Sequence, residues 1–555
     1  MALLAFVLVP VSPAAAAPRV GVPYYRIELD VDYAAGTYVA KQTVTATNQT
    51  DAAWDEITFA VTPARLGTFR LTSSLVRAEP VAATLTGSVL RLPASPAVAP
   101  GQTVTIELAY EVTVPDLVGR FGYSTGILSL GSFYPALNVY RQGPLTSAGQ
   151  PAGWTAHQYV GVGDAFFTEA ADYDVTIRLA QPATVAATGA LVEQSGATWR
   201  YQAERIREFA VSVSDQFRVE SIRVGPTVVA AYYLPEHAAA GTKYLHIARE
   251  SLEWFTEVFG EYPYPQLSIV EMAGDTSENV GQEYPGLILM SGAVWPQTTD
   301  FGDYLTYLLA HEIAHQWFYG IVGNDQLEEP WVDEAIVTWL GKHWQLRVAL
   351  DGQADFLVAP TRPIDAGVYE FPGAGPYFNV VYREGSSLIE EVYQALGDRG
   401  FFWALRDYLS TYRDQVATPA GFTDFLQSYT PRNLNPIYAK YLANPKYRTD
   451  EPLRAGFWTA PVWSRPAPIV FTSSSQLSRI TLYADNRPIW SGTSAGEIVF
   501  DPRDLTAGDH LLTAVVEDES GRWVERSRRI TVADPARPPD QTGADVIRPV
   551  GRFGA

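Results

Sequence analysis

The sequence predicts a multidomain α+β protein with a sheet-rich first part, a mainly helical middle part and a smaller sheet-rich part after it. Apolar and polar residues alternate in short segments up to residue 218, and the 3.6-residue period of helices takes over between residues 219 and 448. Alternation then returns after residue 449. With 555 residues, of which 47% are hydrophobic, the chain is long and apolar enough to bury several cores.

Residues 19–218 are expected to form an N-terminal β-sheet domain. Residues 25–31, 43–47 and 104–108 alternate between apolar and polar side chains, as half-buried strands do, and Gly, Pro and Asp turns separate them. Nothing in this part has the pattern of a catalytic site by itself.

Residues 219–448 are expected to form the mainly helical domain. Apolar residues recur at helical spacing in the segments 244–259, 304–319, 332–348 and 386–396. Gly320 follows the second of these segments and is a plausible helix stop.

Residues 449–533 are expected to form a small immunoglobulin-like β-sandwich. Strand patterns occur at residues 479–483 and 510–516, and the turn residues 518–521 follow. Residues 534–555 are rich in Pro, Gly, Asp and Arg, which predicts a disordered tail.

The chain begins with a signal-like segment, residues 1–18. Residues 2–17 are apolar and end in small residues, as in a secretory signal, although the usual basic start is missing. We expect an exported protein, secreted or associated with the cell envelope. The alternative is an uncleaved apolar tail. Since this segment is too short for a membrane span and no later stretch is long enough, we expect no stable span after processing.

Composition excludes several classes of protein. The 40 basic and 61 acidic residues give a net charge of −21, which repels nucleic acid, so no nucleic-acid partner is expected. The absence of cysteine excludes disulfides, thiolate metal ligands and a cysteine nucleophile.

The strongest chemical signal is the run His311-Glu312-Ile313-Ala314-His315, followed by Glu334 after 18 intervening residues. Residues four apart lie on one face of a helix, so both imidazoles can reach one ion. Two histidines and one glutamate form a standard ligand set for catalytic zinc, with a position left for water. The alternative is a partly buried helix with two ordinary histidines. The zinc site is favoured because two of only 7 histidines in the chain fall here and because a carboxylate follows at a usable distance.

These motifs resemble the zinc aminopeptidase family of aminopeptidase N and leukotriene hydrolase, which are gluzincin metallopeptidases. The H-E-x-x-H run, the 18-residue spacing and Glu334 within W-x-x-E-A are similar to that family's zinc motif. Residues 283–288 resemble its G-x-M-E-N-P-G-L-I stretch, and residues 381–385 resemble its V-Y-E-K-G. The chain departs from the family at Gln282 and Tyr284, where the family has Met and Asn.

The resemblance implies a thermolysin-like zinc peptidase domain over residues 219–448 that holds one Zn²⁺ per chain. It implies that His311, His315 and Glu334 bind the metal and that Glu312 is the general base and then the acid.

It further implies that Tyr382 stabilises the oxyanion and that Glu283 binds the α-ammonium group of peptides with a free N-terminus. Tyr377 and Tyr369 are rivals for the role of Tyr382, and Tyr377 is the second choice as a substrate contact. Without the resemblance, Glu283 is an ordinary loop glutamate.

The implied function is that of a zinc-dependent aminopeptidase. One alternative is a zinc endopeptidase on the same fold, in which Glu283 is structural. Another is a cell-surface binding protein with a vestigial zinc site, which the presence of both Glu312 and Tyr382 disfavours. Epoxide hydrolysis, known for one branch of the family, uses the same zinc residues.

Overall fold

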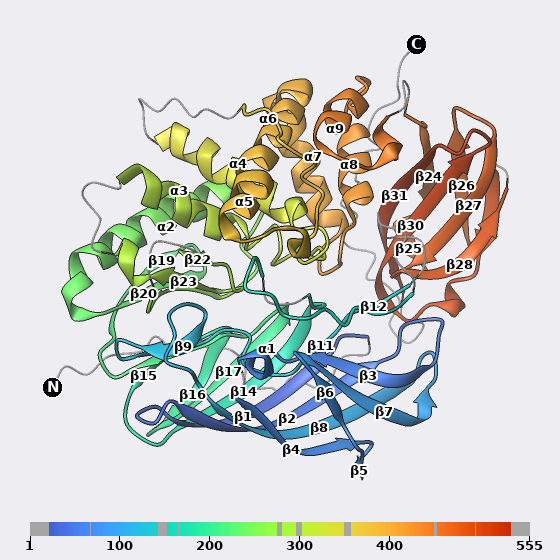
Figure 1. The fold of residues 1–555 in the computed structure, drawn as a ribbon. Coiled ribbons are helices and arrows are strands. Elements are labelled where there is room, and N and C mark those ends of the chain that lie inside the picture. Colours follow the sequence, from blue (N-terminus) through green and yellow to red (C-terminus); the bar gives the residue numbers. More distant parts are fainter. Residues whose placement is uncertain are drawn as a thin grey trace. The chain divides into compact units, whose positions relative to one another are not determined.

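The computed structural model describes residues 21–66, 68–142, 152–164, 167–274, 280–295, 302–348, 357–448, 452–493 and 495–533. The chain divides into two compact units, Met1–Pro452 and Leu453–Ala555. Sheet, helix and sheet follow one another along the chain in the predicted order, so the α+β prediction is confirmed (Figure 1). The signal-like segment 1–18 and the tail 534–555 lie outside the described residues, and export and tail disorder stay predictions. No helix of the described ranges is both long and apolar enough to cross a membrane.

An eight-stranded sheet dominates the first part of unit 1 (Figure 1). Its central strand β1 pairs in parallel with β14 and antiparallel with β2, and every second β1 side chain, such as Ile27 and Leu29, is fully buried. In sheet order the strands are β16 (Ala190–Ser195), β17 (Thr198–Ile206), β14 (Ala171–Leu179), β1 (Tyr24–Asp32), β2 (Thr37–Thr47), β8 (Thr103–Thr113), β4 (Phe69–Val76) and β5 (Glu79–Pro80).

Smaller sheets and one short helix complete this part. One four-stranded sheet contains β15 (Thr184–Ala187), β18 (Val211–Ser214), β10 (Ile127–Leu130) and β9 (Phe121–Ser124). A second contains β11 (Ala136–Leu137), β3 (Trp54–Ala60), β7 (Val89–Val98) and β6 (Thr84–Thr86). A two-stranded ribbon pairs β12 (Tyr140–Arg141) with β13 (Gly153–Trp154), and the helix is α1 (Thr62–Arg65).

A five-stranded sheet opens the second part of unit 1. Its order is β19 (Arg218–Val224), β20 (Thr227–Tyr233), β21 (Gln266–Met272), β23 (Leu287–Ser291) and β22 (Gly281–Gln282). Strands β20, β21 and β23 are parallel, whereas the short edge strand β22 runs antiparallel to β23. The connection between β22 and β23 contains Glu283, so the edge of this sheet positions that carboxylate.

Helix α2 lies between β20 and β21 along the chain, the other helices of this part follow the sheet, and neighbouring helices pack on one another. Helix α2 contacts β19 and β20, α3 contacts α2 and α4, and α4 contacts α6 (Figure 1). The α-helices are α2 (Ala238–Phe259), α3 (Gly302–Ala314), α4 (Trp331–Val348), α5 (Ala374–Tyr377), α6 (Gly385–Leu396), α7 (Asp398–Thr411), α8 (Pro419–Gln427) and α9 (Asn435–Tyr441). Shorter turns are η1 (Pro235–His237), η2 (Gly292–Val294), η3 (Val368–Glu370), the π-helical η4 (Phe378–Glu384) and η5 (Pro445–Tyr447).

Unit 2 consists of two sheets around one core. One sheet contains β24 (Ala455–Thr459), β26 (Ala467–Ser473) and β29 (Gly496–Phe500). The other contains β25 (Val462–Trp463), β31 (Trp523–Val532), β30 (Gly508–Asp518), β27 (Leu477–Ala484) and β28 (Arg487–Gly492), and η6 (Pro502–Asp504) lies between β29 and β30. Apolar residues of both sheets, such as Ile469 and Ile480, share this core, as in a β-sandwich. The narrower immunoglobulin-like assignment stays a prediction.

Candidate metal centre

Helix α3 positions two imidazoles. His311 lies in its last turn and His315 directly follows its last residue, so the two side chains share one helix face. Their ring centroids are 4.9 Å apart, and both side chains are buried. Leu305, Leu309 and Ile313 are buried on the same helix, and this packing fixes the direction in which the imidazoles point.

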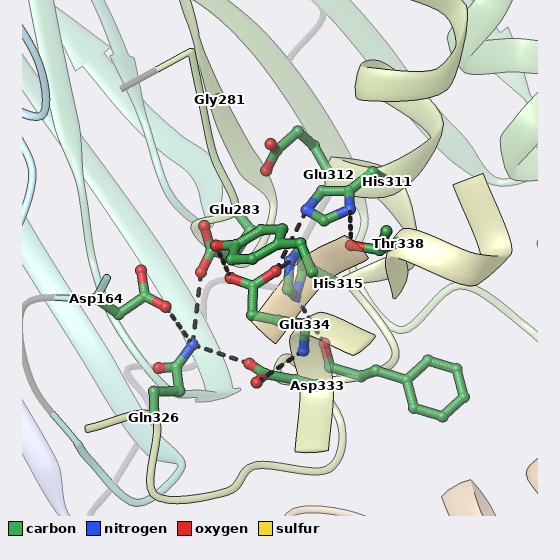
Figure 2. Close-up of polar contacts among 12 residues, drawn as sticks. Asp164, Gly281, Glu283, His311, Glu312, His315, Gln326, Asp333, Glu334 and Thr338 are labelled. Carbon is green, nitrogen blue, oxygen red and sulfur yellow. Dashed lines mark hydrogen bonds and ion pairs between the residues drawn. The ribbon is translucent and has the colours of Figure 1, made fainter. Parts of the chain in front are cut away.

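The first turn of helix α4 brings Glu334 to these imidazoles. Its Oε2 lies 3.4 Å from His311 Nε2 and 3.4 Å from His315 Nε2. One ligand atom from each of the three residues can be chosen so that all lie within 4.8 Å of one another. Figure 2 shows both imidazole rings and the Glu334 carboxylate facing a common centre.

The three residues fit a zinc ion. Both His315 Nε2 and Glu334 Oε2 are buried and lack a hydrogen-bond partner within the described part of the chain. Buried polar atoms without partners are rare in proteins and indicate a site for a ligand. Two imidazole nitrogens and a carboxylate oxygen are the donors that zinc takes in catalytic sites, with a further coordination position left open.

The other ring nitrogens are held by the fold. His315 Nδ1 lies 3.1 Å from the carbonyl oxygen of Phe318, and His311 Nδ1 lies 3.4 Å from Thr338 Oγ1. A proton on His315 Nδ1 leaves Nε2 as the nitrogen with a free lone pair. These contacts therefore present the Nε2 atoms to the metal.

Helix α3 ends at Ala314, five residues before the predicted end at Tyr319. Tyr319 has φ of +103°, which a right-handed helix does not allow. Its hydroxyl donates to Glu208 Oε2 at 2.5 Å, and its carbonyl oxygen accepts from Arg207 Nε at 2.6 Å. Arg207 and Glu208 precede β18, so the sheet-rich part of unit 1 holds the turn that contains the Phe318 carbonyl. The sequence prediction missed this because the contacts span more than 110 residues.

Glu312 lies on α3 between the two imidazoles and points into the cavity described below. Its side chain is buried, Oε2 has no hydrogen-bond partner among the described residues, and burial raises the pKa of its carboxyl to about 8. A proton-transfer role requires a carboxyl whose pKa lies near the working pH. The carboxyl lies against Gly281, where only a glycine leaves space for it.

Tyr382 lies on the π-helical segment η4. Its hydroxyl donates to Glu334 Oε1 at 2.5 Å, and its ring stacks on His311 with centroids 5.8 Å apart. Single π-helical turns are frequent at functional sites because they shift a side chain out of the regular helical register. This segment places Tyr382 directly beside the candidate metal ligands.

Tyr377 lies behind Tyr382. The two rings meet edge to face with centroids 5.6 Å apart, and Tyr377 also packs on Phe371. Tyr377 is 1% exposed and is not one of the described residues that line the cavity, whereas Tyr382 is. The hydroxyl of the other rival, Tyr369, donates to the Gln158 carbonyl oxygen. The structure thus brings only Tyr382 of these three tyrosines to the cavity wall.

Glu283 lies beside the candidate ligands and belongs to a second group of carboxylates. Oxygen atoms of Asp164, Glu283 and Glu334 lie within 4.8 Å of one another. Burial raises the pKa of Glu283 to about 7, and burial also raises the pKa of Asp164. By contrast, burial alone would raise the pKa of Glu334, but His315 and the contacts with both imidazoles outweigh it and lower this pKa to about 2.

The sequence analysis missed Asp164 and two residues that contact it. Gln326 Nε2 donates to Asp164 Oδ2 at 2.8 Å (Figure 2). Arg120 pairs with Asp164 Oδ1 at 3.3 Å and donates to the Gly163 carbonyl oxygen at 2.8 Å. Asp164 and Arg120 come from the sheet-rich part and have no motif around them. Gln326 lies only eight positions before Glu334, and this closeness was the one available signal.

These groups surround one cavity of about 300 Å³. Acidic groups and the imidazole of His311 meet there with aromatic and aliphatic side chains from α3, η4 and the 161–163 loop. The lining residues are Arg120, Gly161, Val162, Gly163, Asp164, Val280, Gly281, Gln282, Glu283, Tyr304, Tyr307, Leu308, His311, Glu312, Glu334, Ala374, Phe378 and Tyr382.

Comparison with known protein families agrees with this centre. Residues 244–441, which include both imidazoles, Glu334 and Tyr382, match the Peptidase family M1 domain. This segment is a Peptidase family M1 domain. The resemblance drawn from the motifs to the aminopeptidase N family is thereby confirmed.

Curated relatives of the M1 domain are distant. The alanine/arginine aminopeptidase of Saccharomyces cerevisiae is 26% identical over 204 residues, which cover 33% of this chain and 24% of that protein. Probable aminopeptidase 2 of Sulfurisphaera tokodaii is 24% identical over 249 residues, which cover 40% of this chain and 31% of that protein. The chain thus spans about a quarter to a third of the length of these relatives.

Solved structures share the fold over a larger part of the chain. An M1 zinc metallopeptidase from Deinococcus radiodurans superposes with a TM-score of 0.55 at 16% identity and covers 78% of this chain and 95% of its own. A mutant of that enzyme with a bound Tyr-Ser-Ala substrate gives a TM-score of 0.54 at 16% identity and covers 76% of this chain and 94% of its own. At this identity the likeness shows the fold alone, over 76% to 78% of this chain.

Proposed function

We propose that this protein is a zinc-dependent aminopeptidase that hydrolyses the N-terminal peptide bond of peptides. The observation that carries this proposal is the pair of carboxylates, Asp164 and Glu283, that lie within 4.8 Å of the candidate ligand Glu334. An α-ammonium group bound by this pair leaves the first peptide bond as the one next to the metal ligands. The names of the relatives, two of which are given above, support the same activity.

His311, His315 and Glu334 would hold the metal. When bound there, zinc supplies Lewis-acid chemistry, because it polarises a carbonyl group and lowers the pKa of water to near neutrality. We expect one zinc ion per chain, since the cluster provides one set of two imidazoles and a carboxylate.

Glu312 would move the proton. Its carboxyl faces the cavity, and burial raises its pKa from the ordinary value toward the neutral range, where a carboxyl can exchange a proton with its surroundings. It first accepts a proton from the attacking water at one Oε atom and then delivers that proton to the nitrogen of the leaving amine.

Tyr382 would donate a hydrogen bond to the carbonyl oxygen of the scissile bond as negative charge develops there. In the structure its hydroxyl donates to Glu334 instead. A hydroxyl hydrogen rotates about its C–O bond, so the same group can turn to the substrate oxygen. The ring is held between His311 and Tyr377, which fixes the position of the donor.

Glu283 and Asp164 would bind the α-ammonium group through charge-assisted hydrogen bonds. Of the residues that line the described cavity, Arg120 is the one lysine or arginine, and it pairs with Asp164. Burial favours the neutral forms of Asp164 and Glu283 while no ligand is bound, and an ammonium group bound between them would favour their charged forms. Asp164 therefore fills the role of a second amine contact, which no motif of the sequence revealed.

The decisive experiment compares fluorogenic amino-acyl amides with their N-acetylated forms, with and without a chelator. We expect cleavage of the free-amine substrates alone, and loss of that cleavage with the chelator and in the Glu312→Gln variant. Asp164→Asn is expected to raise the KM for free-amine substrates by about tenfold or more, because it removes a charge-assisted contact.

The same panel separates the alternatives. Equal cleavage of acetylated substrates or of internal bonds would show an endopeptidase in which Glu283 is structural. Zinc binding without cleavage of any peptide would instead favour the binding protein with a vestigial site. Hydrolysis of an epoxide substrate by the same preparation would show that the zinc residues serve epoxide hydrolysis.

A further inference from the structure

We propose that Gln326 is a positioning residue that gathers Asp164 and Glu283 into the receptor for the substrate's α-ammonium group. This inference rests on the proposed aminopeptidase function. Gln326 lies in the connection between α3 and α4, outside the motifs of the sequence, and its side chain is 2% exposed.

One side-chain nitrogen of Gln326 faces three carboxylates. Gln326 Nε2 lies 2.8 Å from Asp164 Oδ2, 3.0 Å from Asp333 Oδ2 and 3.5 Å from Glu283 Oε1 (Figure 2). The three acids come from separate segments, namely the 161–164 loop, the start of α4 and the connection between β22 and β23. The amide is therefore a shared point of attachment for residues that are 162, 7 and 43 positions away along the chain.

Such a donor is needed because buried carboxylates repel one another. Asp164 and Glu283 are held in one group with Glu334, with their oxygen atoms within 4.8 Å. Hydrogen bonds to a charged acceptor stabilise it more than neutral ones do, and an unpaired buried charge is costly. The two hydrogens of the amide offset part of this repulsion before any substrate binds.

A neutral donor suits an ammonium site better than a cationic one. A lysine or arginine at residue 326 would hold the same carboxylates but would cancel the negative charge that attracts the substrate. The glutamine amide brings two hydrogens and no net charge. It thus orients Asp164 and Glu283 and leaves their charge for the ligand.

The same amide ties the receptor to the metal centre. Asp333, which accepts from Gln326, also accepts from Asn324 Nδ2 at 3.0 Å and from the backbone nitrogen of Glu334 at 3.0 Å. Glu334 is a candidate metal ligand, so Gln326 links the two carboxylates of the receptor to the helix turn that presents this ligand. The distance between the bound ammonium group and the metal selects which peptide bond is cleaved. The link through Gln326 sets this distance.

The test compares two inhibitors that differ only in the α-amine, the hydroxamate of leucine and its desamino counterpart. Both bind through the metal-chelating hydroxamate, so the ratio of their inhibition constants isolates amine recognition. In the zinc-loaded wild type, we expect the amine to strengthen inhibition. In Gln326→Met this advantage falls by about tenfold to a hundredfold, while the inhibition constant of the desamino compound is unchanged.

The matched control is Gln427→Met. Gln427 is also a buried glutamine, but its amide donates to the carbonyl oxygens of Thr430 and Arg432 on the helical side of unit 1. A loss of stability alone would act similarly in both variants, whereas only Gln326→Met is expected to change the ratio. Gln326→Asn, which keeps an amide but shortens its reach by one methylene, is expected to lose most of the amine advantage as well.

Two failures are distinguishable. If the wild type binds both hydroxamates equally, the proposed ammonium receptor and with it the aminopeptidase function is wrong. The wild type and both Gln326 variants could instead all bind the amine-containing hydroxamate more tightly. That result would support the ammonium receptor and overturn the role of Gln326. Equal weakening of both compounds in Gln326→Met would assign the residue to the metal centre and would also overturn the inference.

Discussion

Gly281 lies so close to the Glu312 carboxyl that a Cβ atom at residue 281 would stand 2.0 Å from Glu312 Oε1. The atom in the way is the end of a flexible side chain, so an added methyl group displaces the carboxyl instead of breaking the fold. This single contact thus connects the edge of the five-stranded sheet with the proposed general base.

Replacing Gly281 by alanine is expected to lower kcat by about 100-fold, because a displaced base loses its position relative to the substrate. Zinc content and the melting temperature are expected to change little. The measurement is kcat on an amino-acyl amide together with the zinc content of the purified protein. Gly400→Ala is the control, since a Cβ there meets only Leu396 Cβ at 3.7 Å. Full activity in Gly281→Ala would show that Glu312 does not need this position.

The hydroxyl of Tyr382 is expected to account for most of the contribution that this residue makes to kcat. Tyr382→Phe keeps the ring on His311 and removes only the donor, so we expect kcat to fall by about 100- to 1,000-fold with zinc retained. Steady-state kinetics on the free-amine substrate measures this loss. Tyr377→Phe, a change in the ring packed behind Tyr382, is the control and is expected to leave kcat close to that of the wild type. A larger loss of kcat in Tyr377→Phe than in Tyr382→Phe would assign the oxyanion contact to Tyr377.

Zinc is expected to stabilise the folded chain through the three candidate ligands. A ligand that binds only the native state adds about 4 kcal/mol to the free energy of unfolding at about 1,000 times its Kd. Thermal unfolding with and without zinc, after treatment with a chelator, measures this gain. Glu334→Ala should abolish it, whereas Glu312→Gln should retain it, because Glu312 lies in the cavity as a base and not as a ligand. A loss of the gain in Glu312→Gln would instead make Glu312 a ligand.

Glu208 gives the stability of unit 1 a pH dependence. Burial raises the pKa of its carboxyl to about 8, well above the ordinary value of 4.5. Between these two pH values the folded state holds a proton that the unfolded state releases, so the free energy of unfolding falls as pH rises. Glu208→Gln removes this dependence and still offers an oxygen to the Tyr319 hydroxyl.

We therefore expect Glu208→Gln to become progressively more stable than the wild type from pH 5 to pH 9. Urea unfolding at several pH values measures the difference. The exposed Glu79→Gln is the control and should follow the wild type. A constant difference across this range would show that Glu208 is ionised in the folded state throughout.

The local part of the site could be predicted from the sequence. The spacing of His311 and His315 determines that both imidazoles share a helix face, because four residues make about one turn. Glu334 was predicted from its spacing after the two histidines and Tyr382 from the resemblance to a family motif, and the structure brings both of them to the two imidazoles. The strand and helix regions could also be predicted, since alternation and 3.6-residue periodicity are properties of consecutive residues.

Only the tertiary structure decided which distant segments contact one another. Asp164, Arg120 and Gln326 enter the site through contacts across separate parts of unit 1, and no periodicity or motif records such pairs. The turn after α3 has the same origin, because Arg207 and Glu208 contact Tyr319, whose positive φ helical spacing alone does not reveal. Local geometry set the metal ligands, whereas long-range packing of buried polar groups decided what surrounds them.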